Sequence, residues 1–390
     1  MRSFTFDTSV REIGAPKVLP FSATAKLQNN TDNKKINTIL IESPFKNEWL
    51  SNSIDPQKKE PIMRYIASIL VLAFSSYTAS AESLCNQWSE PVEMGSLPED
   101  PIEEASGLIA TPFHLLNIND SGSAAKLYWT TQTGDLVKTH RLSVDRYYDT
   151  EALAVFKTPE TNYIIVGDIG DNHERRGEAL AGMGFVANII QYPMVELHVF
   201  KSKSLHPDEA PEFSHTIKVK YPDGPHNAES MAVHPTTGDL FILTKESRFD
   251  KYGHRPSQLF RFTKSQWLTQ RSRTLTIEKV RDLPIHEINA EKGDYGKLAT
   301  GMDISPDGKF LLILTYDNAL EFKWESVIAP SRNLVRNRDY SEIPTKNLTQ
   351  EEAISYLEQS PRTIIYTTEV GRSIDSSSSD SPIIKQSCIR

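Results

Sequence analysis

The sequence lacks the short motifs that mark several common enzyme classes. It has no G-x-S-x-G, no G-x-x-x-x-G-K-[ST] and no G-x-G-x-x-G, which argues against a serine nucleophile elbow, a P-loop and a dinucleotide-binding turn. Its ten histidines form neither H-x-H nor H-E-x-x-H, so zinc is a less expected metal. The formal net charge of −8 is not that of a nucleic-acid-binding protein, and we expect no nucleic-acid partner.

Cysteine is also scarce, since Cys85 and Cys388 are the only two. In an oxidising compartment they can pair, and the bond would tie together the two ends of the chain that follows residue 81. Two free thiols are the alternative.

Long apolar runs are missing as well. The uncharged stretch 65–81 is 17 residues long, which is short for a membrane span. With Arg64 before it and Ala79-Ser80-Ala81 at its end, the segment 63–81 has the form of a secretory signal peptide. We expect a periplasmic or secreted protein with no stable membrane anchor after cleavage; a retained signal anchor is the alternative. Residues 1–62 are interpreted as an upstream extension of the reading frame or a disordered leader.

Helical periodicity is scarce, and residues 82–390 read as short strands separated by Gly, Pro, Asp and Asn. Five segments share one pattern, in which a polar, a small and an apolar residue are followed by alternating polar and apolar residues. The segments recur at intervals of about 45 to 80 residues. They begin at Ser106, Glu151, Glu229, Thr300 and Glu352. A second strand is expected after each, at 126–132, 163–169, 240–246, 311–317 and 363–369. Turns are predicted at 234–239 and 305–309.

Four-stranded units at this spacing predict an all-β fold, namely a β-propeller. The repeats indicate five blades, or six if the two long intervals contain a degenerate blade. The last unit lacks outer strands after 363–369, and residues 89–98 from the other end of the domain could complete it. Such closure leaves no open sheet edge. A Cys85–Cys388 bond would lock the seam, so residues 82–390 are predicted to form one propeller domain.

Four blocks carry a family resemblance: "VGDIGDNHERR", "YPDGPHNAESMAVHPTTGDLFILTKE", "TGMDISPDGKFLLILTYDNALEF" and "EEAISYLEQSPRTIIYTTE". They resemble the DIGDN and NAES-type motifs of a family of secreted bacterial β-propeller proteins, and are more distantly similar to esterase-like-phytase and other calcium-dependent propellers. The resemblance covers roughly residues 100–370. It implies the propeller fold and no settled activity, and the segment 177–193 is longer and more apolar than the usual family loop.

The repeat also predicts a functional site. Because the first strand of each propeller blade lines the central channel, Glu151, Glu229 and Glu352 are expected to converge there. The ends of the second strands add further candidates for ligand binding, namely Asp168, Lys245, Glu246, Asp317 and Glu369. His226, three residues before Glu229, is a candidate general acid or base together with Glu151 and Glu229.

Converging carboxylates repel, so a compensating charge is required. A hard cation such as calcium takes oxygen ligands, and the metal candidates are Asp171, Asn172, Glu151 and Glu229. The alternatives are neutralisation by Lys245, raised carboxyl pKa values, and a purely structural role in which Asp168, Asp171 and Asn172 cap turns.

Two functions follow. The first is a calcium-dependent hydrolase of ester, lactone or phosphoester substrates, with a central cation that polarises an oxygen and activates water. The second is a non-catalytic periplasmic binding or scaffold propeller with a structural cation or none. We expect a small-molecule or cation ligand at the channel, and a monomer.

Overall fold

The computed structural model describes residues 83–120, 125–144, 147–171, 195–245, 256–269, 274–329, 332–369 and 381–389, and three short strands nearer the N-terminus. The chain divides into two compact units, residues 1–81 and 82–390. The first contains an antiparallel sheet of β1 (Ser3–Thr5), β2 (Thr24–Leu27) and β3 (Ile39–Glu42). The signal-peptide segment 63–81 lies outside the described residues, so cleavage stays a prediction. Among the residues described, no helix is long and apolar enough to cross a membrane.

The second unit consists of five sheets, which we number as blades 1 to 5 in chain order. Blade 1 is β5 (Ala105–Ala110), β6 (His114–Asn119), β7 (Lys126–Thr131) and β8 (Leu136–Arg141). Blade 2 is β9 (Ala152–Lys157), β10 (Asn162–Asp168), β11 (Val195–Ser202) and β12 (Glu212–Lys220), with β16 (Thr274–Thr276) added in parallel at its outer edge. Blade 3 is β13 (Ala228–Val233), β14 (Leu240–Thr244), β15 (Ser257–Phe262) and β17 (Glu278–Leu283).

Blade 4 is β18 (Ala299–Ile304), β19 (Phe310–Thr315), β20 (Ala319–Lys323) and β21 (Tyr340–Ile343). Blade 5 is β22 (Glu351–Leu357), β23 (Ser360–Thr368), β24 (Ser381–Ser387) and β4 (Val92–Leu97). Short helices lie between strands: α4 (Lys264–Thr269), α5 (Ile285–Ile288), the 3-10 turn η4 (Tyr295–Lys297) and α6 (Trp324–Ile328).

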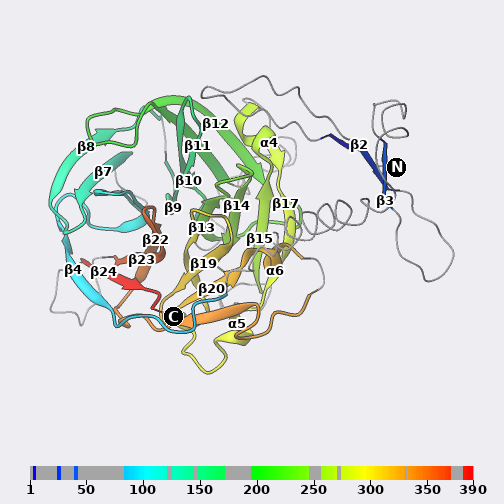
Figure 1. Ribbon diagram of the computed structural model, residues 1–390. Helices are drawn as coiled ribbons and strands as arrows, with labels where there is room; N and C mark the ends of the chain where they lie inside the picture. Colours follow the sequence, from blue (N-terminus) through cyan, green and yellow to red (C-terminus); the bar gives the residue numbers. More distant parts are fainter. Residues whose placement is uncertain are drawn as a thin grey trace, which may run out of the picture. The chain divides into compact units, whose positions relative to one another are not determined.

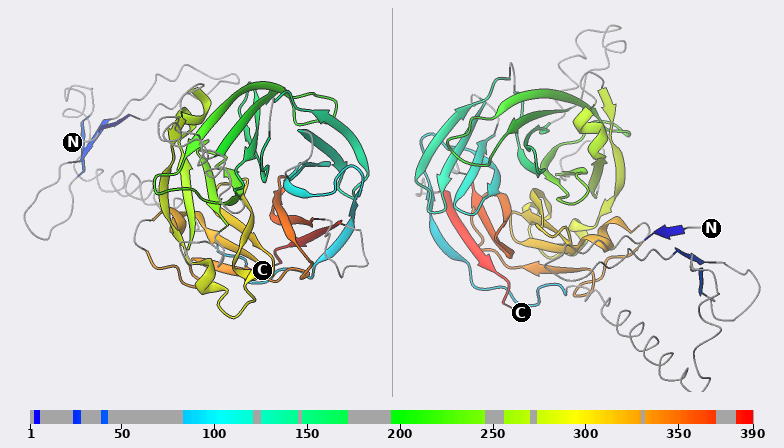
Figure 2. Two further views of the ribbon diagram at one scale, coloured as in Figure 1. Left: turned by 180° about the vertical axis from the view of Figure 1, so that it is seen from behind. Right: turned by 45° about the horizontal axis from the view of Figure 1, so that its top comes forward.

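The blades close into a ring, which confirms the predicted five-bladed propeller. The inner strands β5, β9, β13, β18 and β22 each contact the inner strands of the two neighbouring blades. Figure 1 shows β9, β13 and β22 towards the middle, with β4, β8, β12 and β17 at the periphery. Both views in Figure 2 show the sheets around a common centre.

The seam of the ring lies in blade 5, as predicted. Strand β4 from the start of the domain pairs with β24 from its end, and Cys85 and Cys388 form a disulfide across 303 residues of sequence. The isolated bridge between Trp88 and Cys388 extends this pairing. Residues 89–98 therefore complete the blade, together with β24, which the sequence analysis did not assign.

One strand assignment was wrong. The sequence analysis took 126–132 as the second strand of blade 1, but this segment is the third strand, β7, and the second strand is β6. The aromatic and β-branched run "KLYWTT" reads more strongly as a strand than "HLLNIN" does. Because of this error the sequence analysis missed Asp120, the residue that follows β6.

The apolar runs of the sequence are explained by burial between blades. Every residue of β14 and of β19 is buried, because a propeller blade is covered on both faces by its neighbours. Each fully buried Leu, Ile or Phe side chain contributes about 1.5–3 kcal/mol, so these strands supply much of the stability.

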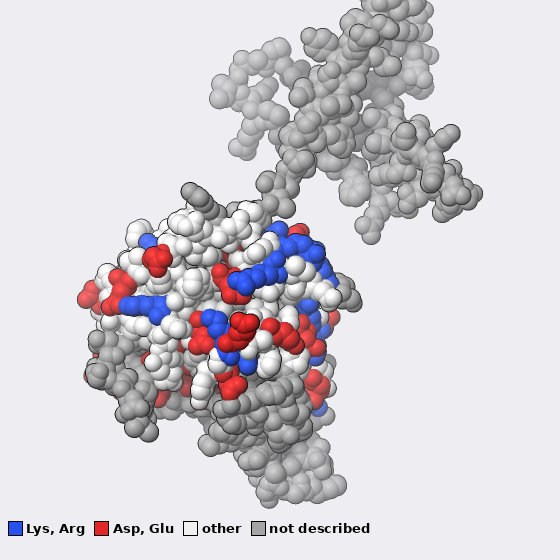
Figure 3. All heavy atoms as spheres, turned by 90° about the horizontal axis from the view of Figure 1, so that it is seen from below, with Lys and Arg blue, Asp and Glu red and all other residues white. Residues whose placement is uncertain are grey.

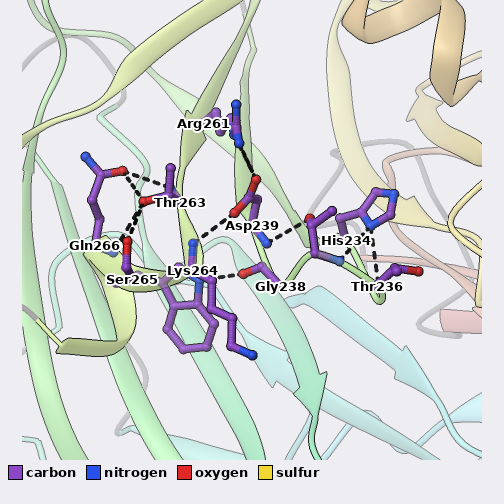
Figure 4. Close-up of polar contacts among 11 residues, drawn as sticks. His234, Thr236, Gly238, Asp239, Arg261, Thr263, Lys264, Ser265 and Gln266 are labelled. Atoms are coloured by element: carbon purple, nitrogen blue, oxygen red, sulfur yellow. Dashed lines mark hydrogen bonds and ion pairs between the residues drawn. The ribbon is translucent and has the colours of Figure 1, made fainter. Parts of the chain in front are cut away.

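The predicted turn at 234–239 is confirmed, and side chains fix it (Figure 4). The His234 N–H donates to the Asp239 carbonyl at 2.9 Å. The Asp239 carboxylate accepts the Arg261 Nε–H and the Lys264 N–H, both at 2.9 Å. Gly238 has φ +74°, which favours glycine. The turn thereby ties β14 to β15 and to the start of α4.

The face of the molecule seen in Figure 3 is mixed in charge. On the face seen in Figure 3, acidic and basic side chains of the described residues lie side by side over its middle. The expectation of no nucleic-acid partner stays a prediction.

Candidate functional site

The aligned polar residues stand at one end of the central channel, where the inner strands begin. In four blades the register with the second strand shifts at this point, between Ala105/Gly107, Ala228/Ser230, Ala299/Gly301 and Glu351/Ala353. The residues skipped by these shifts are Ser106, Glu229, Thr300 and Glu352. A β-bulge of this kind re-aims a side chain, so the repeat detected in the sequence is a repeated bulge.

Blade 2 reaches the same arrangement without a bulge. Glu151 directly precedes β9, and its N–H donates to the Gly167 carbonyl at 3.0 Å. The Ser106 hydroxyl donates to the Glu151 carbonyl at 2.8 Å and contacts Glu151 Oε2 at 3.0 Å. The inner ends of blades 1 and 2 are thus joined at the channel.

Blades 3, 4 and 5 are joined through one lysine. Lys245 Nζ forms an ion pair with Glu229 Oε2 and donates to the Tyr316 hydroxyl at 2.7 Å. The Tyr316 hydroxyl in turn donates to Glu352 Oε1 at 2.6 Å. We call Ser106, Glu151, Glu229, Lys245, Tyr316 and Glu352 the channel network.

Burial controls protonation within the channel network. Burial raises the pKa of Glu229, Lys245 opposes the rise and Glu352 adds to it, which leaves that pKa at about 8. Burial, and then the charges of Glu229, Asp120 and Asp149, raise the pKa of Glu151 well above its usual range. Burial lowers the pKa of Lys245, but the charges of Glu229 and Glu352 raise it more, so the lysine stays protonated. One lysine cannot neutralise all these acids, and a proton or another cation is needed.

A carboxylate cluster adjoins the network. Oxygen atoms of Asp120, Asp149 and Glu151 all lie within 4.8 Å of one another. Glu151 is 3% exposed, and its Oε1 has no hydrogen-bond partner among the described residues. Gly170 makes room for the cluster, since a Cβ there would lie 2.5 Å from both Asp149 Oδ2 and Glu151 Oε1. We call Asp120, Asp149 and Glu151 the carboxylate cluster.

Two further residues predicted to bind a ligand, Glu369 and Asp317, lie at the ends of second strands in different surroundings. Glu369 accepts a hydrogen bond from Gln350 Nε2 at 2.6 Å, and burial followed by the charges of Glu352 and Asp120 raises the pKa of Glu369 to about 7. It therefore lies beside the channel network. Asp317 lies against η4, where a Cβ on Gly296 would be 2.2 Å from its Oδ2.

Asp168, the last residue of β10, and Asp171, in the turn that follows, are both buried. Asp168 accepts the N–H groups of Tyr148 and Asp149, each at 2.9 Å, and so fixes the segment that carries Asp149 into the carboxylate cluster. The Asp171 N–H donates to Asn227 Oδ1 at 2.7 Å, which links the "DIGDN" and "NAES" blocks. Asn172 and Glu246 lie outside the described residues, and their roles stay predictions.

His226 is buried beside Asp223. Its Nε2 lies 2.9 Å from Asp223 Oδ1, and its ring packs at 5.0 Å from Tyr221 and 5.5 Å from Phe260. These contacts hold the histidine in the segment between β12 and β13, against β15. Its role as a general acid or base stays a prediction.

Three residues of the site were missed in the sequence, namely Asp120, Asp149 and Tyr316. Asp120 follows the second strand of blade 1, and assigning β6 correctly would have found it by the rule that selected Asp168. Tyr316 precedes the acid that was selected, Asp317. Asp149 lies two residues before Glu151, in the irregular segment ahead of β9, and no repeat marks it.

The other ends of the inner strands line a cavity of about 190 Å³, whose lining includes the apolar residues Ala110, Val233 and Ile304 and the acidic residues Asp303 and Glu358. Acidic groups therefore occur at both ends of the inner strands, whereas the channel network and the carboxylate cluster lie where the strands begin.

Comparisons with known proteins show no family for this chain. No family model matches it, and no curated protein matches it. Solved structures with some likeness include a PQQ-bound aldose sugar dehydrogenase from Streptomyces coelicolor, with 10% identity, a TM-score of 0.39, and coverage of 78% of this chain and 99% of that chain. A luciferin-regenerating enzyme has 9% identity and a TM-score of 0.39, covering 77% and 96%. A chain of a nidogen/laminin complex has 11% identity and a TM-score of 0.33, covering 69% and 73%. Likeness at this level carries no conclusion about activity.

Proposed function

We propose that the channel of this propeller binds one divalent cation at the carboxylate cluster and is the site of a calcium-dependent hydrolase. The observation that carries the proposal is Glu151 Oε1. This oxygen is buried and has no hydrogen-bond partner among the described residues. One carboxylate oxygen of Glu151 lies within 4.8 Å of oxygens of Asp120 and Asp149. An unpaired buried oxygen costs about 1–3 kcal/mol, and a cation would remove that cost.

The donor set fits a hard cation. All three side chains offer carboxylate oxygen, which is the ligand type that calcium takes, and calcium completes its shell of six to eight ligands with carbonyls and water. Glu229 was a predicted metal ligand too, but its described partner is Lys245. We therefore place the ion with Asp120 and Asp149 instead of with Glu229.

The channel network supplies groups for hydrolysis beside this site. A bound calcium would polarise an ester or phosphoester oxygen and lower the pKa of a water. Glu229, whose pKa burial raises, is the candidate to exchange a proton with a leaving group or water beside its partner Lys245. Lys245 carries the positive charge that would attract an anionic or carbonyl oxygen to the channel mouth.

Calcium binding is tested on the purified chain after chelation. Titration calorimetry should show about one ion bound, and both Glu151→Gln and Asp120→Asn should abolish the heat. Glu212→Gln, an exposed carboxylate on β12, is the matched control and should bind like the unmodified chain. Equal heats in all four proteins would refute the site.

Hydrolysis is tested separately with ester, lactone and phosphoester panels. The proposal predicts turnover that chelation abolishes and calcium restores, and a loss of turnover in Glu229→Gln with calcium binding retained. Calcium binding without turnover of any panel would favour the second function, a non-catalytic binding propeller in which the ion is structural.

Export is part of the proposal. The Cys85–Cys388 disulfide is typical of an oxidising compartment, which supports a periplasmic or secreted protein. Mass spectrometry of protein recovered outside the cytoplasm should give an N-terminus at Glu82; an N-terminus upstream of residue 63 would contradict cleavage at the predicted site.

A further inference from the structure

A second group of ligand-type side chains lies in blade 2, away from the channel network. Asp168 ends β10 and is directly opposite Glu196 in β11. His198 follows Glu196 by two residues, and alternation in a strand puts both on one face of the sheet. One ligand atom from each of these three residues lies within 4.8 Å of the other two.

His198 has an unsatisfied atom aimed into this group. The side chain is 1% exposed, and Nε2 has no hydrogen-bond partner among the described residues. Nε2 lies 3.8 Å from Asp168 Oδ2 and 3.9 Å from Glu196 Oε2, which is too far for hydrogen bonds. The nitrogen therefore lies close to both carboxylates without a hydrogen bond to either of them.

The other ring nitrogen of His198 is held. Nδ1 lies 2.9 Å from Thr216 Oγ1, and the Tyr147 ring packs edge-on at 4.9 Å. When Nδ1–H donates to the threonine hydroxyl, Nε2 carries the lone pair and points it at the two carboxylates. Metal-binding histidines are oriented in this way by a partner on the second nitrogen.

Asp168 is held in a similar manner. Backbone N–H groups of Tyr148 and Asp149 each donate to one of its carboxylate oxygens, which fixes the orientation of the carboxylate. Glu196 completes the group from the rim, since its side chain is 25% exposed. Two buried, oriented ligands and one accessible ligand make a site that an ion can enter.

We propose that Asp168, Glu196 and His198 bind a divalent transition-metal ion, with zinc as the best fit. Zinc takes imidazole nitrogen at about 2.0–2.1 Å and carboxylate oxygen at about 2.0–2.2 Å, so tetrahedral ligand atoms stand about 3.3–3.6 Å apart. The spacings of 3.8 and 3.9 Å need to shorten by only a few tenths of an ångström. An imidazole ligand favours zinc over calcium at this site, whereas the carboxylate cluster offers oxygen alone.

The competing occupant is a proton. A protonated His198 between two carboxylates would also balance the charges, with no metal. The two sites are linked along the chain, because Asp168 fixes the segment that carries Asp149 and Glu151. Their ligands are nevertheless different residues, so each site can be removed by itself.

The test is zinc binding by the purified, chelator-stripped protein in competition with a chromogenic chelator. We expect one zinc per chain, and a loss of affinity of about 100-fold or more in Glu196→Gln and in His198→Gln. Thr216→Val should weaken binding about 10- to 100-fold, because outer-shell partners of ligands have effects of that size. Glu196→Gln changes a partly exposed side chain, so it keeps the test valid if His198→Gln does not fold.

Two controls separate this proposal from the calcium proposal. Glu212→Gln on the neighbouring strand and Glu151→Gln in the carboxylate cluster should both keep full zinc affinity. Cobalt should bind with visible d–d absorption that Glu196→Gln removes. Absence of zinc binding, or zinc binding that survives both Glu196→Gln and His198→Gln, would overturn the proposal and leave the proton as the occupant, whatever the result with calcium.

Discussion

Tyr316 joins the charged groups of the channel network. Its hydroxyl accepts from Lys245 at 2.7 Å and donates to Glu352 at 2.6 Å. Tyr316→Phe removes one hydrogen bond from each of two buried or half-buried charges, and we expect it to lower the free energy of unfolding by about 1–3 kcal/mol. Denaturant unfolding measures this. Tyr295→Phe, at a side chain that is 65% exposed, should change it little; equal effects of the two substitutions would contradict the network.

Glu369 is expected to make stability depend on pH. Its pKa is raised from about 4.5 in the unfolded chain to about 7 in the fold, by burial and then by the charge of Glu352. Because the folded state holds this proton more tightly than the unfolded chain does, protonation of Glu369 stabilises the fold. The stabilisation is fully present below the unfolded pKa and is lost as the pH rises through about 7.

Glu369→Gln should remove that dependence while keeping an acceptor for Gln350. In excess chelator, the melting temperature of Glu369→Gln relative to the unmodified protein should be higher at pH 8 than at pH 4.5. A difference that is the same at both pH values would show that Glu369 does not titrate in this range.

At this scale the sequence predicted residue types better than exact positions. Glu151, Glu229, Lys245 and Glu352 were selected, and the structure brings them together at the channel. Tyr316 was missed in favour of the next residue, because a shift of one residue at a strand end exchanges the side chain that faces a given direction. His198 and Asp168 are brought together by the register between β10 and β11, and no short sequence motif indicates that register.

The elements position the site through irregularities. Bulges at Ser106, Glu229, Thr300 and Glu352 turn these side chains out of the regular strand. The polar-small-apolar repeat in the sequence results from that geometry, and the repeat located five inner strands correctly. The second strand of blade 1 was missed because its residues are less typical of strands than those of β7.

Gly170 is the position at which the turn after β10 can be tested. A Cβ there would lie 2.5 Å from Asp149 Oδ2 and Glu151 Oε1, so Gly170→Ala must displace the carboxylate cluster. We expect calcium affinity to fall by at least about tenfold, which is about 1.4 kcal/mol, with a lower melting temperature. Gly293→Ala, where a Cβ meets nothing within 4 Å, should leave both unchanged. Unchanged calcium affinity in Gly170→Ala would place the ion elsewhere.

The whole molecule depends on closing the ring. Pairing of β4 with β24 and the Cys85–Cys388 disulfide join segments from opposite ends of the domain. Repeat spacing and cysteine positions predicted both, because closing the ring requires the two ends of the domain to contact each other. The identity of β24 did not follow, since residues 370–380 separate it from the rest of its blade.

Removing the disulfide should destabilise the propeller by about 2–5 kcal/mol, because the unfolded chain is no longer constrained by the long loop. The double variant Cys85→Ser/Cys388→Ser should melt at a lower temperature than the oxidised protein, and at the same temperature as the protein after reduction. If reduction leaves the melting temperature unchanged, the seam is held by strand pairing alone.

The central claim is a cation held by the carboxylate cluster at the end of the channel where the inner strands begin. The most direct measurement is calorimetric titration of calcium into the chelated protein, with the melting temperature followed in parallel. We predict about one ion bound and a rise in melting temperature, both lost in Glu151→Gln and retained in Glu212→Gln. No heat and no thermal shift in the unmodified protein would contradict the claim, and would mean that protons and Lys245 alone balance the channel acids.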